Sequence, residues 1–173
     1  MASDSTPGSL GMIRWQWAFQ EWATTHLLDA AGMLPEEALR APGAIPGGRG
    51  DGSTWETLAH LVGAEQQWLE RWLGDADSTF RSGKHYRSLH ELRTASEDTS
   101  GRRRVWLSGL GPAALSERPT GEEPLWMALL HVANHTTHHR AEACAALTTA
   151  GAPPQGVDML EWIDAGCPGA EGP

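Results

Sequence analysis

The chain has 173 residues, the size of one ordinary domain, and its 40% apolar content with nine tryptophans provides material for a substantial core. Its 22 acidic and 13 basic side chains give a formal net charge of −9, which disfavours a nucleic-acid partner because phosphate binding needs clustered Lys and Arg. The N-terminal residues lack the features of a signal peptide and no apolar run could span a bilayer, so we expect a cytoplasmic protein with no membrane partner.

Helical periodicity begins near residue 11 and predicts a first helix over about 11–34. Trp15, Phe19 and Trp22 recur along it at helical spacing and form an apolar stripe that suits either the core or a partner subunit. The segment 35–52 is rich in glycine and proline, which predicts a long loop of a kind that is often functional.

Two capping boxes, in which a serine and a glutamate three residues later satisfy free backbone donors, mark the next helices. The first box, at 53–56, opens a helix that ends near residue 73, and the second, at 88–91, opens a helix over about 89–109. Two more helices are predicted over about 124–150 and 158–165, the second of them a short closing helix.

No alternating pattern is long enough to build a sheet, so the sequence predicts an all-α fold. The most economical arrangement is a four-helix bundle with a short C-terminal closing helix. We expect one bundle domain over 11–165, between a flexible N-terminus (1–10) and a flexible tail (166–173).

The fourth predicted helix carries four of the eight histidines within nine residues. His135 and His139 are four apart, so their imidazoles point to the same side of the helix, one turn apart. The H-E-x-x-H metalloproteases chelate zinc with this spacing, but here the intervening residues are Thr-Thr-His, so the glutamate base of that motif is absent. A surface or hydrogen-bonded core pair is the alternative, and it is the interpretation that we prefer for His26, His85 and His90.

A metal site needs a third ligand from elsewhere, and His60 inside the second helix is the best candidate. Bundles often build metal sites from side chains on facing helices, and three nitrogens leave at least one coordination position open. Neutral imidazoles suit several divalent ions, including zinc, nickel and iron.

Three stretches of the chain carry a family resemblance: TWETLAHLVGAEQQWLERWLG, LLHVANHTTHHRAE and TTAGAPPQGVDMLEWI. They resemble the second helix, the fourth helix and the closing segment of the DinB/YfiT-like superfamily of small metal-binding bundles; the DNA polymerase that shares the name is unrelated. The resemblance implies the DinB/YfiT-like four-helix bundle and one divalent metal ion (Zn, Ni or Fe) held by His60, His135 and His139. It also implies a homodimer.

One departure concerns the residues after the His-Arg pair of the fourth helix, where the family commonly has Gly-Gln and this chain has Ala141-Glu142. Glu142 could orient an imidazole from behind or be a solvated charge. His131, one turn before His135, could line the pocket, and Glu56, one turn before His60, is a second carboxylate that could lie near the ion.

Neither cysteine is a convincing catalyst: Cys144 falls on the helix face opposite the histidines and Cys167 lies in the tail. Trp162 of the closing helix is expected in the core or as a cover over the pocket.

The resemblance implies a metal-dependent thiol S-transferase, in which a low-molecular-weight thiol such as bacillithiol or mycothiol attacks a small electrophile. Two alternatives remain open at this stage. One is a metal-dependent hydrolase, and the other is a non-catalytic metal-binding or stress-related bundle.

Overall fold

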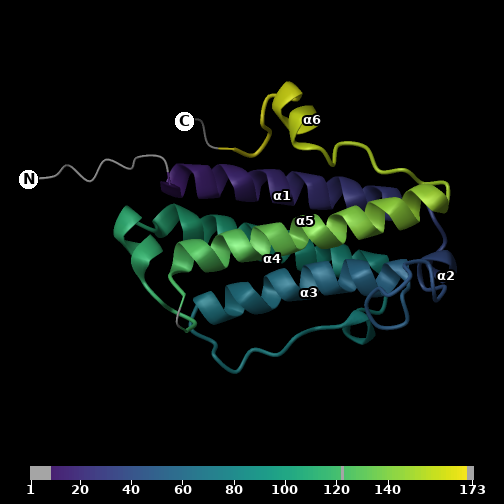
Figure 1. The fold of residues 1–173 in the computed structure, drawn as a ribbon, viewed down its shortest axis with the longest axis horizontal. Coiled ribbons are helices and arrows are strands. Elements are labelled where there is room, and N and C mark those ends of the chain that lie inside the picture. Colours follow the sequence, from purple (N-terminus) through teal and green to yellow (C-terminus); the bar gives the residue numbers. More distant parts are fainter. Residues whose placement is uncertain (1–8, 122, 171–173) are drawn as a thin grey trace, which may run out of the picture.

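A computed structural model describes residues 9–121 and 123–170, and in it four long helices pack side by side (Figure 1). These are α1 (Ser9–Ala31), α3 (Thr54–Trp72), α4 (Leu89–Gly109) and α5 (Leu125–Thr149). The shorter elements are α2 (Glu36–Leu39), α6 (Met159–Asp164) and two 3₁₀ turns, Gly83–His85 and Pro112–Ser116. No strand occurs in the described residues, so the predicted all-α bundle with a short closing helix is confirmed.

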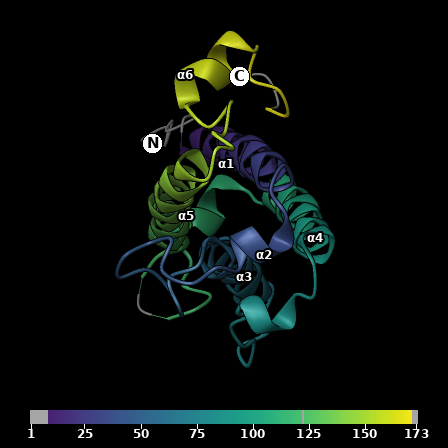
Figure 2. The same cartoon turned by 90° about the vertical axis from the view of Figure 1, so that its right-hand side faces the viewer.

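Each long helix packs against two others, and the view down the bundle shows α1 and α3 on opposite sides (Figure 2). α5 lies against α1 and α3, and α4 lies against the same two helices from the other side. Because α3 and α5 are neighbours, the helix that carries His60 faces the helix that carries His135 and His139.

The helix starts follow the predicted caps only in part. Ser53 Oγ accepts the N–H of Glu56 at 3.2 Å, and Ser88 Oγ accepts the N–H of Glu91 at 3.2 Å, as expected of N-cap residues. The two glutamate carboxylates do not accept the backbone N–H of their N-cap serines, so the predicted capping boxes are only half formed. Glu56 accepts from the backbone of Gly83 and Glu91 accepts from that of Arg87, so each carboxylate fastens a neighbouring connection.

The two faces of α1 serve different purposes. Trp17 on one face is buried in the bundle, where its ring meets Trp72 of α3 with centroids 6.4 Å apart. Trp15 and Phe19 on the other face pack against Trp162 of α6, with ring centroids 4.7 and 5.7 Å away. The predicted tryptophan stripe is therefore covered by the C-terminal segment of the same chain.

Trp162 has no exposed surface and lies against α1, so its predicted alternative place over the histidine pocket is wrong. Figure 1 shows α6 on the far side of α1 from α3, which explains why the closing helix cannot reach His60. The indole N–H of Trp162 donates to the carbonyl of Pro168 at 3.1 Å, and this bond holds the segment after α6 against the aromatic cluster on α1.

The chain ends are described only in part. Residues 1–8 and 171–173, which belong to the predicted flexible ends, lie outside the described residues. Within the remainder, α1 begins at Ser9, and Cys167 and Ala170 pack beside Trp162. None of the described helices combines the length and apolar character needed to cross a membrane.

Candidate metal centre

Three imidazoles from α3 and α5 meet between these two helices. His60 Nε2 lies 3.0 Å from His135 Nε2, and the ring of His139 lies 4.5 Å, centroid to centroid, from each of the other two rings. One ring nitrogen from each residue falls within 4.8 Å of the others. The structure thus brings together the three histidines that the sequence singled out, although 75 residues separate His60 from His135.

This geometry fits a divalent ion. A tetrahedral centre with metal–nitrogen bonds of about 2.0–2.1 Å places its ligand nitrogens about 3.3 Å apart, close to the separation of His60 and His135. All three donors are nitrogens, a set that zinc, nickel and iron accept and that calcium and magnesium do not favour. With three protein ligands, at least one coordination position faces away from the protein donors.

The protonation of the cluster also suits metal binding. Burial is the largest cause that lowers the pKa of His60 to about 3, and the nearby His139 ring and the charge of Arg49 disfavour its protonation further. Burial likewise lowers the pKa of His135 to about 4 and lowers that of His139, for which contact with Glu142 acts in the opposite direction. Neutral imidazole is the form that ligates a metal, so the rings are ready for an ion at neutral pH.

Glu142 orients His139 from behind. Its Oε2 lies 2.6 Å from His139 Nδ1, which leaves Nε2 of that ring to face the cluster. Its Oε1 lies 3.3 Å from Nε2 of the exposed His138. His138, His139 and Glu142 also form a second group of potential ligands, but the 2.6 Å separation within it is that of a hydrogen bond.

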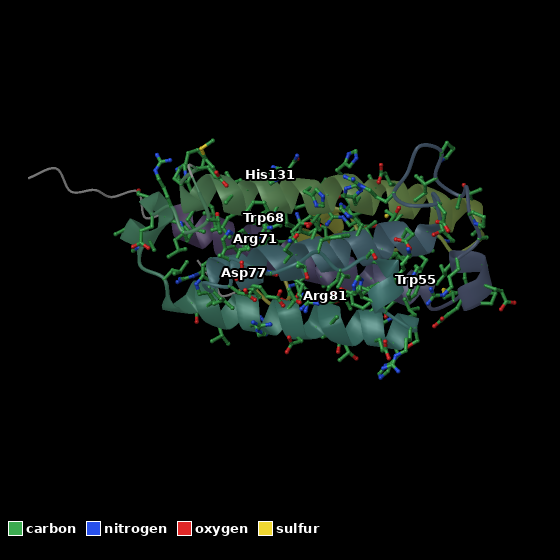
Figure 3. All side chains as sticks on the ribbon, turned by 90° about the horizontal axis from the view of Figure 1, so that it is seen from below. Trp55, Trp68, Arg71, Asp77, Arg81 and His131 are labelled. Carbon is green, nitrogen blue, oxygen red and sulfur yellow. The ribbon has the colours of Figure 1, made fainter. Side chains whose placement is uncertain are left out.

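Aromatic side chains from α3 and from the segment between α3 and α4 flank the histidine cluster. The ring of Phe80 lies 5.1 Å from that of His60, and this exposed phenylalanine belongs to the segment between α3 and α4. His131, one turn before His135, is exposed and packs 6.0 Å from Trp68 of α3; both are labelled in Figure 3. His131 thus extends the wall of the site without joining the three convergent nitrogens.

Gly63 allows this connection to lie close to the metal ligands. A Cβ atom at Gly63, three residues after His60, would fall 2.0 Å from the backbone oxygen of Arg81. The segment with Phe80 and Arg81 can therefore approach α3 only at a residue without a side chain. Arg81 is held there by an ion pair with Glu70 of α3 at 3.0 Å.

The remaining predicted site residue, Glu56, lies elsewhere. Its carboxylate is absent from the convergent groups and accepts the N–H of Gly83 at 3.3 Å. A Cβ atom at Gly83 would lie 2.5 Å from Glu56 Oε1, so the two segments are in tight contact. Glu56 therefore anchors the connection that carries Phe80.

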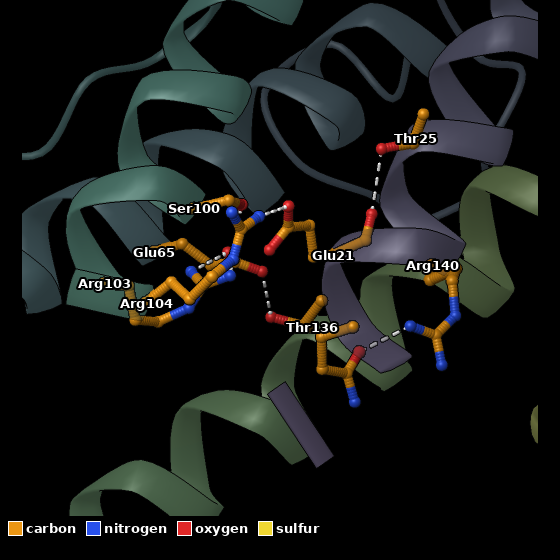
Figure 4. A network of polar contacts seen from close by, with 9 residues as sticks. Glu21, Thr25, Glu65, Ser100, Arg103, Arg104, Thr136 and Arg140 are labelled. Carbon is orange, nitrogen blue, oxygen red and sulfur yellow. Dashed lines mark hydrogen bonds and ion pairs between the residues drawn. The ribbon is translucent and has the colours of Figure 1, made fainter. Parts of the chain in front are cut away.

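A buried polar network links α3, α4 and α5 inside the bundle (Figure 4). Arg103 of α4 pairs with Glu65 of α3 at 2.6 Å, and Thr136 of α5 donates to the other oxygen of Glu65 at 2.9 Å. Ser100 accepts a further bond from Arg103 at 3.1 Å. Thr136 directly follows His135 in the sequence. Its bond to Glu65 therefore fixes the rotation of α5 relative to α3 close to the histidine cluster.

Sequence reasoning missed three parts of this site. Phe80 lies between two predicted helices, in a segment without periodicity, and Arg103 and Glu65 look like ordinary helix charges in the sequence. One signal was present: a lone glycine inside a helix, such as Gly63, often marks close approach of another segment. Arg49, whose charge contributes to the lowered pKa of the three histidines, lies in the glycine-rich loop, where no periodic pattern places its side chain.

The DinB family model matches residues 15–169 of the chain. No curated protein and no solved structure matches the chain. The match covers the four long helices from residue 15 onward and the closing helix, and it includes all three histidines of the cluster. The chain therefore belongs to the DinB family.

Proposed function

We propose that this protein is a metal-dependent thiol S-transferase that joins a low-molecular-weight thiol to a small electrophile. A divalent ion held by His60, His135 and His139 would bind the thiol as its thiolate and lower its pKa. The single observation that supports this proposal is the set of three neutral imidazoles, from two helices, with no protein thiol among them.

The nucleophile must then come from a cosubstrate. Cys144 lines a different cleft, beside Phe19 and residues 157–159, and burial raises the pKa of its thiol. A thiol with a raised pKa is a weak nucleophile at neutral pH. In the proposed reaction the thiol proton passes to solvent and sulfur forms a bond to carbon. The leaving group departs with the electron pair of its broken bond.

The chain's own residues would hold and shield the reactants. His139, oriented by Glu142, keeps its ring in a fixed position for the ion. Phe80, beside His60, offers an apolar surface against which an electrophile can pack. Trp68 and His131 continue this surface along α3 and α5.

The test is thiol consumption by purified protein loaded separately with zinc, nickel or iron. A model thiol and an aryl halide such as 1-chloro-2,4-dinitrobenzene are incubated with each form, and free thiol is followed with time. We expect metal-dependent loss of thiol in the parent and only background loss in His135→Ala. His90→Ala, which removes an exposed imidazole at the start of α4, is the matched control and should retain full activity.

Other outcomes separate the alternative functions. Turnover of an ester without added thiol would favour a metal-dependent hydrolase. Tight metal binding without turnover across several thiols and electrophiles would contradict the proposal and favour a non-catalytic metal-binding bundle.

A further inference from the structure

A cleft of about 520 Å³ lies between α1, α5 and the segment that leads into α6. The residues of α5 that line it recur at helical spacing and therefore share one face of that helix: Thr137, Arg140, Ala141 and Cys144. At about 100° per residue, the metal-binding candidates His135 and His139 fall on the opposite face of α5. The cleft is therefore separate from the candidate metal centre.

Arg140 is a buried positive charge in the wall of this cleft, with only 5% of its surface exposed. Its Nη1 donates to Oε1 of Gln20, a bond drawn in Figure 4, and its Nη2 lies 3.5 Å from Oγ1 of Thr137. The guanidinium carbon also lies 4.8 Å from the centre of the Phe19 ring. These contacts hold the guanidinium in place, but all three partners are neutral, and most of its N–H groups have no partner among the described residues.

The second buried arginine of the bundle shows what Arg140 lacks. Arg103 is 2% exposed, and its charge is compensated by the carboxylate of Glu65 at 2.6 Å. Among the residues that the structure describes, no carboxylate lies at ion-pair distance from Arg140. Burying a charge costs free energy unless an opposite charge compensates it. An anion in the cleft would compensate Arg140 as Glu65 compensates Arg103.

The rest of the wall indicates what such an anion would carry with it. Much of it is apolar and comes from all three segments: Phe19, Ala141, Val157 and Met159. Sites for small organic molecules combine apolar walls with a few placed polar groups, in volumes of about 300–1,000 Å³. The acidic member of the wall, Asp158, is occupied as the N-cap of α6, where its Oδ1 accepts the N–H of Leu160 at 2.8 Å.

We propose that this cleft binds a small organic carboxylate whose charged group pairs with Arg140 and whose apolar body packs against Phe19 and Met159. The planar guanidinium can donate two parallel N–H bonds to the two carboxylate oxygens. The site is a second ligand site on the other face of α5, and it does not depend on the proposed function of the metal centre. Cys144 lies in the same wall and offers a local reporter of occupancy.

The test titrates full-length protein with phenylbutyrate and with its neutral counterpart phenylbutanamide, using calorimetry. We expect the carboxylate to bind about tenfold more tightly than the amide, because hydrogen bonds to a charged group are the stronger ones. Bound phenylbutyrate should slow the modification of Cys144 by N-ethylmaleimide, followed by peptide mass spectrometry, and leave the rate at Cys167, outside the cleft, unchanged. His60→Ala, which we expect to lack the metal ion, should bind phenylbutyrate as the parent does.

Variants assign the preference to the charge of Arg140 and the binding to the cleft. In Arg140→Met the carboxylate and the amide should bind within about twofold of each other, and Arg140→Lys should retain part of the difference. Ala141→Trp fills the cleft from an exposed position, leaves Arg140 in the chain and should abolish the binding of both probes. Thr94→Trp, at an exposed position on α4, is its control and should bind both probes like the parent.

Four results would overturn the proposal. The first is equal binding of phenylbutyrate and phenylbutanamide, or no saturable binding of the carboxylate, by the parent protein. The second is a charge preference that persists in folded Arg140→Met. The third is binding that leaves the modification rate of Cys144 unchanged or that survives in Ala141→Trp, since the ligand would then lie elsewhere. The fourth is loss of binding in folded His60→Ala, which would assign the carboxylate to the metal ion.

Discussion

Oε2 of Glu142 lies 2.6 Å from Nδ1 of His139, and this contact turns the other nitrogen of that ring toward His60 and His135. The two residues are three apart on α5, so one helix supplies both the metal ligand and the carboxylate that orients it. The departure from the family's usual Gly-Gln pair therefore lies directly behind the candidate metal centre.

Replacement of Glu142 by glutamine should weaken metal binding. The amide can still accept a hydrogen bond from His139, but it has lost the negative charge that makes the imidazole a better donor to the metal. We expect zinc affinity to fall by about tenfold, measured by competition with a chromophoric chelator. Glu97→Gln, an exposed change on α4, is the control; equal affinities in the two variants would contradict the orienting role.

Thr136→Val should destabilise the protein. Thr136 and Glu65 are both buried, and loss of the hydroxyl removes the hydrogen bond that Thr136 donates to one carboxylate oxygen of Glu65. The expected loss is about 1–3 kcal/mol in the free energy of unfolding, measured in urea with a chelator present.

A matched change is available on α4. Thr99 is equally buried, and its hydroxyl has no hydrogen-bond partner among the described residues. Thr99→Val should therefore have little effect or stabilise the protein. If Thr99→Val costs as much as Thr136→Val, the buried network is not the source of the stability.

Gly63→Ala should separate the Phe80 segment from α3. The new Cβ would lie 2.0 Å from the backbone oxygen of Arg81, so the backbone on one side must shift. We expect a cost of about 1–3 kcal/mol in the free energy of unfolding. Gly101→Ala is the control, since nothing lies within 4 Å of its Cβ position on α4, and it should gain about 0.5–1 kcal/mol. Equal effects at the two sites would show that the connection does not pack as described.

The stability of metal-free protein should fall as pH falls below the ordinary histidine range. Burial lowers the pKa of His60 to about 3 and that of His135 to about 4, whereas in the unfolded chain both titrate near about 6.5. Between about pH 6.5 and 4 the unfolded chain therefore binds more protons than the folded one, and acid favours unfolding. Above about pH 7 both histidines are deprotonated in the folded and the unfolded chain, so they contribute nothing to the pH dependence of stability.

Urea unfolding of chelator-treated protein at several pH values checks this dependence. His60→Gln, which removes one of the two groups, should show a shallower loss of stability between pH 6.5 and 4 than the parent. His90→Ala should behave like the parent, because His90 is exposed. A parent curve that is flat over this range would contradict the lowered pKa values.

Much of the bundle could be predicted because its helices are amphipathic and their ends carry strong local signals. The third predicted helix agrees with α4 (Leu89–Gly109), and Ser53 and Ser88 cap α3 and α4 as expected. The destinations of the glutamates at 56 and 91 could not be predicted, because their partners lie in connections whose paths depend on tertiary packing.

The faces of α1 show the same limit. The sequence predicts an apolar stripe that includes Trp15 and makes no prediction for Trp17, yet Trp17 is the one that packs inside the bundle against Trp72. Trp15 meets Trp162 instead, because the path of the C-terminal segment covers that face of α1. At the site, the spacing of His135 and His139 and the family resemblance were enough to identify three histidines. Arg49 and Phe80 come from loops, where no periodic pattern places a side chain.

The central claim is that one metal ion is shared between α3 and α5, and metal content after removal of the single ligand on α3 tests it most directly. We expect purified parent protein, and the His90→Ala control, to retain about one zinc, nickel or iron per chain after dialysis, measured by elemental analysis. His60→Ala should lose most of this metal while keeping its helical circular dichroism spectrum. A folded His60→Ala protein that still holds a full equivalent of metal would contradict the account.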